Sequence, residues 1–351
     1  NRLAGTLVAT GLMSNEQQLG NLDYSVAGTL AEHRSILNMK GGVVDVELRA
    51  NGGWDGEYLS QRFDYGRIQP DGFDSWRLQQ NPQLRVSAAA GQLSEHCWKQ
   101  QVAGICIEAS NWDADSLQSA VAVNDFALAS LQPLLAEGFT IDGTVDADLK
   151  LVRNTAGLQG ELHWRQSRTS LAYADDIDEF ETVLDEVGIT LLTNSTQTIL
   201  SANLSGEQGL NMKATAKVKG PLVADSPLQA SAKGRLPDIG LLRPLLQRAL
   251  NPGELEGELT VALEVAGTLG DPLFTGGANL ADGALGLLAA GVVLSDINIT
   301  AQSVGTDKLQ VTGHLRSGDG RADILGEIRA VEDTDLVADI RISGQNLATV
   351  R

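Results

Sequence analysis

The chain has 351 residues, and acidic residues outnumber Lys plus Arg by 45 to 26, which gives a formal net charge of −19 at pH 7. This balance excludes nucleic acid as a partner, because nucleic-acid-binding proteins carry a basic stripe. An apolar content of 42% is enough for a large ordered core. No run of about 18 apolar residues is present, so the sequence predicts no helix that spans a bilayer.

Apolar and polar residues alternate strictly along much of the chain, and this period of two predicts half-buried β-strands. Clear examples in chain order are residues 44–50, 210–218, 254–265 and 336–343. We expect on the order of twenty strands, most of them ending near Gly or an Asn/Asp/Gly cluster. The predicted fold class is all-β with a few short helices.

Two segments break the alternation, near residues 129–137 and 239–250. Their leucines have helical spacing, which predicts a short helix in each. Both contain the sequence Pro-Leu-Leu, which starts at Pro133 and at Pro244. Each is followed by a strand-like run that begins with Gly. This predicts an internal repeat of roughly 110 residues, which is typical of stacked units in one rod rather than of separate globular cores. The repeat-like units would be 1–124, 125–237 and 238–351. Both ends of the chain fall inside patterned segments, so we expect a segment of a longer protein.

The predicted inward face is aliphatic and shallow, because the sequence has 38 Gly and only 4% aromatic residues. Two architectures remain open on composition alone: a plain β-sandwich or solenoid, and a long, curved sheet that encloses an apolar groove. In the second, the apolar positions of the alternating runs would line the groove. The candidate lining residues are Val44, Val46, Leu48, Val145, Leu149, Leu200, Leu204, Leu210, Met212, Val218, Leu259, Val261, Leu263, Val265, Leu309, Val311, Ile324, Ile328, Ile340 and Ile342.

Four motifs resemble the TamB family, the inner-membrane-anchored subunits of the translocation and assembly module of Gram-negative bacteria. They are Gly28-Thr-Leu-Ala-Glu-His33, Gly52-Gly-Trp54-Asp-Gly, Trp76-Arg-Leu with Pro82-Gln-Leu84, and the more specific Gly267-Thr-Leu-Gly-Asp-Pro272 followed by Leu-Phe-Thr-Gly-Gly277. The resemblance extends over essentially the whole chain. It favours the groove, because this AsmA-like superfamily is similar to the bridge-like lipid-transfer proteins, whose taco-shaped β-groove carries phospholipid.

The resemblance also implies a location and partners. It implies a periplasmic segment of a protein that is anchored in the inner membrane through an N-terminal part absent from this chain. It implies an Omp85-type outer-membrane barrel, TamA, as a partner, through residues beyond this segment. The ligand would be phospholipid or another acyl chain, and no cofactor is implied.

Cys97 and Cys106 flank a segment in which Val102-Ala-Gly104 is suited to a hairpin turn. Facing cysteines in a hairpin come close enough to form a disulfide, which persists in an oxidising compartment such as the periplasm. Two unpaired thiols in the core are the alternative.

The sequence does not favour an enzyme or a metal site. His33, His96, His163 and His314 lie far apart in the sequence, and no nucleophile elbow, phosphate-binding loop or HExxH helix is present. His163 falls on the polar face of its strand, as expected of a solvated histidine. The densest acidic cluster, at residues 175–186, lacks EF-hand spacing, and a solvated turn or strand end explains it better than calcium does.

Four of the five tryptophans, Trp54, Trp76, Trp98 and Trp112, lie in the first third of the chain. They are explained either by a local constriction in the groove or, as we favour, by more conventional packing of that end.

Two functions of different class follow. The first is a lipid conduit in which acyl chains lie along the aliphatic groove. The second is a scaffold or chaperone for outer-membrane proteins that pairs client strands with an open sheet edge.

Overall fold

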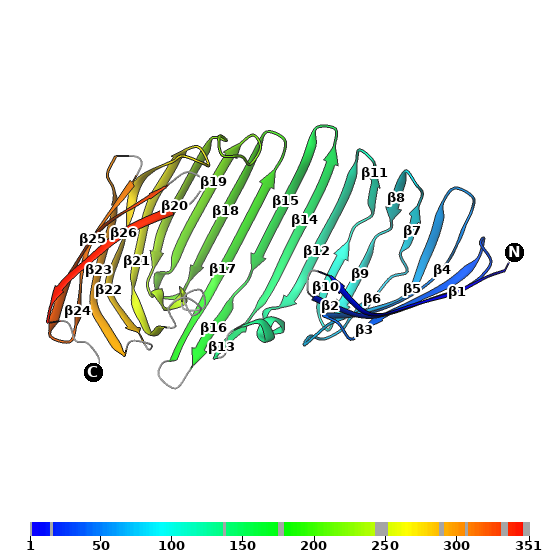
Figure 1. Ribbon diagram of the computed structural model, residues 1–351, viewed down its shortest axis with the longest axis horizontal. Helices are drawn as coiled ribbons and strands as arrows, with labels where there is room; N and C mark the ends of the chain where they lie inside the picture. The colour runs from blue at the N-terminus through cyan, green and yellow to red at the C-terminus, as the bar shows by residue number, and fades with distance from the viewer. Residues whose placement is uncertain are drawn as a thin grey trace. The chain divides into compact units, whose positions relative to one another are not determined.

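The computed structural model describes residues 2–14, 17–135, 138–174, 179–242, 252–287, 291–305, 308–330 and 336–346. Strands take up 76% of the structure and helices 4%, which confirms the predicted all-β class. The described strands number 26 and belong to one antiparallel sheet (Figure 1). None of the helices in the described ranges is long and apolar enough to cross a membrane.

The chain divides into two compact units, residues 1–133 with 144–163 and residues 134–143 with 164–351. The repeat boundaries expected after residues 124 and 237 remain a prediction. The chain crosses into the second unit after residue 133, returns after residue 143 and crosses for the last time after residue 163, within strand β15 (Gly157–Gln166).

Unit 1 contains both long and very short strands. They are β1 (Leu3–Ser14), β2 (Gln17–Gly28), β3 (His33–Lys40), β4 (Val44–Trp54), β5 (Leu59–Pro70), β6 (Trp76–Leu78), β7 (Gln83–Val86), β8 (Ala90–Leu93), β9 (His96–Gln100), β10 (Ala103–Ile107), β11 (Ser110–Asp113), β12 (Leu117–Ala127) and β14 (Thr144–Asn154).

The short strands of unit 1 form two tiers between the long strands β5 and β12. The first half of β5 pairs with β7, which leads through β8 and β11 to the start of β12. The second half of β5 pairs with β6, which leads through β9 and β10 to the middle of β12. The sheet therefore splits and rejoins inside this unit, and we call the two branches the β7 tier and the β6 tier.

Unit 2 is more regular, because from β16 onward each strand pairs with the next in the sequence. Its strands are β13 (Phe139–Asp142), β16 (Thr169–Ala174), β17 (Glu179–Thr193), β18 (Gln197–Gly206), β19 (Asn211–Lys219), β20 (Leu228–Leu236), β21 (Pro252–Gly267), β22 (Pro272–Leu287), β23 (Val292–Ser303), β24 (Lys308–Ser317), β25 (Gly320–Ala330) and β26 (Leu336–Gln345).

The described helices are all short 3₁₀ segments: η1 (Leu128–Leu134), η2 (Glu207–Gly209) and η3 (Ile239–Leu242). The helix expected near 129–137 is thus present as a 3₁₀ helix that contains Pro133. Proline lacks the N–H that an α-helical bond requires and disfavours helical backbone in the residue before it, which suits a short segment. Of the second expected helix, only 239–242 lies in the described residues.

The two cysteines form the expected disulfide. Cys97 in β9 faces Cys106 in β10, with a Cα–Cα distance of 4.0 Å. That distance is closer to the separation of a non-hydrogen-bonded pair than to that of a hydrogen-bonded pair. The turn differs from the expected one: it is the two residues Gln101 and Val102, because Gln101 adopts a φ of 52° and Ala103 already pairs with Gln100.

Replacing both cysteines with Ser should lower the free energy of unfolding by about 2–3 kcal/mol, because the bond restricts a short loop in the unfolded chain. Chemical denaturation of the double variant, beside the oxidised and the reduced parent protein, measures this. Equal stability of the reduced and oxidised parent would contradict it.

Candidate functional site

In unit 2, the pairing register sorts side chains onto two faces, because directly paired residues of neighbouring strands project to the same side of a sheet. One unbroken series of direct pairs crosses the ten strands from β17 to β26, and every residue in it is apolar. This central rung consists of Val187, Leu204, Met212, Gly234, Val261, Ala278, Ala301, Val311, Gly326 and Ile340.

The face that carries the central rung is the apolar face. All of the candidate groove residues that lie in strands of unit 2 project from it: Leu200, Leu204, Met212, Val218, Leu259, Val261, Leu263, Val265, Leu309, Val311, Ile324, Ile328, Ile340 and Ile342. Leu210 lies just before β19 and is buried. Small residues occupy many of the positions between them, such as Ala214, Ala216, Ala230 and Ala232.

Burial on the apolar face varies along the sheet. Val311 and Ile324 are 4% exposed, and they belong to a cluster with Ile297, Leu315 and Ala322 from β23, β24 and β25. These strands belong to a single sheet in the described part of the chain, so their own coiling must turn this face inward. Leu200, Ile340 and Ile342, by contrast, are 42%, 49% and 57% exposed.

The opposite, polar face carries the alternate residues of the same strands. The residues that neighbour the central rung in sequence also pair across the strands and project from the polar face. They include Asn203, Lys213, Lys233, Gln302 and Gln310. Exposure follows the alternation in β21, where Ala262 and Glu264 are exposed while Val261, Leu263 and Val265 are half-buried.

Ion pairs hold charged groups in place on the polar face. The Arg235 Nη2 atom lies 2.7 Å from Glu258 Oε2, and the Lys233 Nζ atom lies 2.8 Å from Glu264 Oε1. The hydrogen bond from each cation lowers the pKa of the carboxylate that it contacts. Both carboxylates therefore stay charged through the neutral pH range, and this face stays hydrated.

Two hollows of unit 2 open on the polar side of the sheet. The larger, of about 540 Å³, is lined by residues that include Ser201, Thr215, Lys217 and Ser231, and the other, of about 290 Å³, by residues that include Asn279 and Thr300. Residues of the apolar face also border these hollows, namely Val265 in the larger one and Val261 and Ala278 in the smaller one.

Unit 1 also has an apolar face. Val46 in β4 pairs with Ile68 and Met39, and Leu48 pairs with Leu37, so Val44, Val46 and Leu48 share that face. Val145 and Leu149 in β14 project to the face of Phe126 and Val121 in β12. Val145 is 2% exposed.

Three of the four early tryptophans pack against their own sheet. Trp76 is buried and stacks on Phe126, with ring centroids 6.2 Å apart. A Cβ atom added to Gly66 would meet the Trp98 ring at 2.7 Å, and one added to Gly91 would meet the Trp112 ring at 2.2 Å. Trp54 remains 40% exposed.

The four histidines are held by local partners and do not come together. His33 is buried, with Nδ1 3.3 Å from the Thr29 carbonyl oxygen and Nε2 2.8 Å from Gln61 Nε2. His163 Nε2 lies 2.6 Å from Glu161 Oε1, and that hydrogen bond lowers the pKa of Glu161.

Within the described ranges, no group of three or more His, Cys, Asp or Glu side chains is arranged to hold a metal ion. The first part of the acidic cluster, residues 175–178, lies outside the described residues.

The fold and its faces define a class: a repetitive, single-sheet β protein whose second unit carries a continuous aliphatic face. The chain belongs to the TamB family, because the model of the TamB N-terminal domain matches residues 4–280. That family consists of envelope proteins that act as non-enzymatic assembly or transport components of the translocation and assembly module, with TamA as the associated partner. Searches of curated proteins and of solved structures returned no match.

Trp98 and Gly66 allow a direct test of packing on the apolar face of unit 1. Gly66→Ala should lower the free energy of unfolding by about 1–3 kcal/mol, because the new methyl group overlaps the indole ring. Gly104→Ala is the matched control, since a Cβ atom there meets no other atom within 4 Å. Equal effects of the two substitutions in thermal or denaturant unfolding would show that Trp98 does not pack over Gly66.

Proposed function

We propose that the chain forms a periplasmic segment of a phospholipid conduit between the inner and outer membranes, with acyl chains lying along the apolar face of unit 2. The central rung carries this proposal, because it gives ten neighbouring strands a continuous apolar path. An acyl chain gains about 0.8 kcal/mol for each CH₂ group that it buries. Headgroups would remain in water at the margin of this face.

The composition of the rung suits movement along it as well as binding. Gly234, Ala278, Ala301 and Gly326 separate the larger side chains of the rung. Such a lining gives similar contacts at each step, so no single position holds the chain much more tightly than its neighbours. A tight pocket would instead retain the lipid.

A scaffold for outer-membrane protein assembly, acting with TamA, is the second candidate. The Ile340 and Ile342 side chains of β26 are exposed, and an unfolded client polypeptide would bury its own apolar side chains against such residues. An extended client strand adds to a sheet edge through backbone hydrogen bonds. The two candidates differ in what contacts the apolar face: lipid in the first, polypeptide in the second.

Photo-crosslinking at two adjacent positions separates the candidates. Met212 lies on the apolar face and Lys213 on the polar face. A photoreactive residue at 212, in the complete protein in cells, should crosslink to phospholipid, while one at 213 should not. Crosslinks to polypeptide from 212 would favour the scaffold, and equal lipid labelling from both positions would contradict a lipid-binding face.

A charge placed in the central rung should interrupt the lipid path. Val261→Glu puts a carboxylate where a hydrocarbon chain would lie, and an unpaired charge in an apolar contact is costly. We expect the transfer of phospholipid between the two membranes by the complete protein in cells to fall by about tenfold, because every lipid that moves along the rung must pass β21. Ala262→Glu, one residue along on the polar face, is the control and should leave the transfer rate unchanged. Undiminished transfer by a folded Val261→Glu protein would refute the path at β21.

A further inference from the structure

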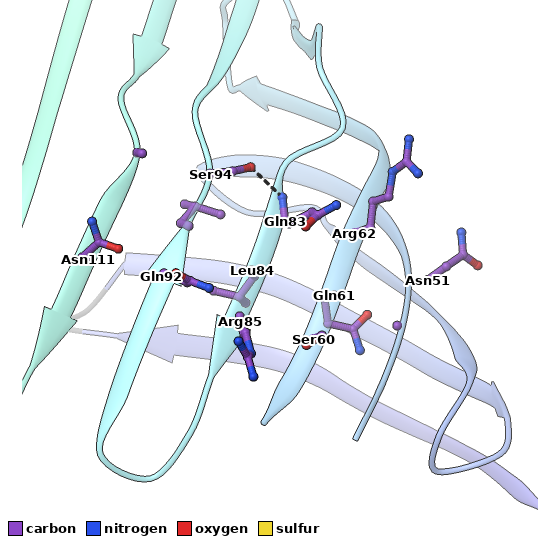
Figure 2. Close-up of a pocket in the computed structure, with 13 residues that line it drawn as sticks. Asn51, Ser60, Gln61, Arg62, Gln83, Leu84, Arg85, Gln92, Ser94 and Asn111 are labelled. Carbon is purple, nitrogen blue, oxygen red and sulfur yellow. Dashed lines mark hydrogen bonds between the residues drawn. The ribbon is translucent and has the colours of Figure 1, made fainter. Parts of the chain in front are cut away.

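A polar hollow of about 460 Å³ lies in the β7 tier of unit 1. Its side chains come from β4, β5, β7, β8 and β11, side by side in Figure 2. Direct pairs join Ser60 to Arg85, Arg85 to Gln92 and Gln92 to Asn111, so these four side chains form one row on one face.

A second row lies beside the first, because Arg62 pairs directly with Asn51 on one side and with Gln83 on the other. Arg62 and Ser60 project to the same face, being two residues apart in one strand. By the same pairing, Gly52, Leu59 and Leu84 belong to the opposite face, so the two polar rows share one face of the sheet, although Gly52 and Leu84 also border the hollow.

The lining includes two guanidinium groups and no carboxylate, in a chain with 45 acidic residues. The guanidinium group of Arg62 has no hydrogen-bond or ion-pair partner among the residues that the structure describes. The Arg85 guanidinium lies 3.9 Å from the centre of the Tyr58 ring, which holds it in place, and its Nη2 atom lies 3.9 Å from Asp55 Oδ2.

Two carboxylates that contact residues of the hollow, Asp64 and Asp55, are already engaged. Asp64 Oδ2 accepts a 2.9 Å hydrogen bond from Asn51 Nδ2. Asp55 Oδ1 accepts the backbone N–H groups of Tyr58 and Glu57 at 2.7 and 2.9 Å, and these bonds lower the pKa of Asp55. Neither carboxylate neutralises Arg62.

Two kinds of side chain in this lining, guanidinium groups and amides, match two kinds of ligand group. Guanidinium groups bind carboxylate and phosphate through two parallel hydrogen bonds. The amides of Asn51, Gln83, Gln92 and Asn111 each offer donors and an acceptor, which matches the hydroxyl groups of a sugar. The volume is in the range of small-molecule sites.

We propose that this hollow binds a saccharide that carries an acidic group, with Arg62 and Arg85 on the acidic group and the amides on the sugar hydroxyls. The proposal is independent of the lipid conduit, because the hollow lies in unit 1 and its lining includes none of the candidate groove residues.

Isothermal titration of the purified chain with digalacturonate, and separately with glucose 1-phosphate, tests the proposal. At least one of these acidic sugars should bind saturably, and neutral maltose should bind at least about tenfold more weakly. Arg62→Gln should weaken the binding by about tenfold, as expected when a charge-assisted hydrogen bond is lost. Asn111→Ala should weaken it too, with a smaller effect.

Arg77→Gln is the control, because Arg77 is an exposed arginine of the β6 tier outside the hollow. It should leave the affinity unchanged. All of these side chains are exposed, so the variants should fold, which circular dichroism checks. Absence of saturable binding, equal loss in the Arg62 and Arg77 variants, or equally tight binding of inorganic phosphate alone would overturn the proposal.

Discussion

Strand register is the constraint on which unit 2 depends. A shift of one residue in any strand would move all of its apolar side chains to the solvent face. Ten strands must therefore be paired correctly in succession for the central rung to remain apolar. Local turn chemistry contributes to this: between β17 and β18, Asn194 Oδ1 accepts the N–H groups of Thr196 and Gln197 at 2.9 and 3.0 Å, which fixes the turn and hence the pairing that follows.

The same register explains how one sheet gains burial without a second layer. Where β22 to β25 coil, larger side chains such as Ile297, Val311 and Ile324 meet across neighbouring strands, while Gly313 and Gly326 lie between them. Small residues allow the face to close on itself without steric overlap. In this part of the sheet, aliphatic side chains and glycines therefore form the buried cluster without aromatic rings.

Much of this could be predicted from the sequence, because the period-two pattern alone assigns each residue to a face. It placed Val261 and Leu263 on one face and Glu264 on the other, as the pairing shows. The pattern fails where the period is broken. Bulges near Asp282 and Asp296, both with positive φ, change the alternation before Ile297, so a strict period of two does not assign this buried residue to its face.

Unit 1 was harder to predict, because its packing depends on contacts between distant residues. Nothing local indicates that Trp98 would lie over Gly66, and the two tiers arise only because β5 pairs with two different strands. The polar hollow was missed for the same reason. Arg62 and Arg85 are ordinary polar positions in two separate strands, and they line one hollow only after the sheet has assembled.

The two faces set different requirements on the residues that they carry. On the apolar face the requirement is only that each position be aliphatic or small, as the residues of the central rung show. On the polar face, an ion pair such as Arg235 with Glu258 requires particular groups at particular positions. Alternation lets the two faces of unit 2 meet these requirements separately, because neighbouring residues of a strand project to opposite faces. The cost of this arrangement is that both depend on the same register, so an error in strand pairing would affect both faces together.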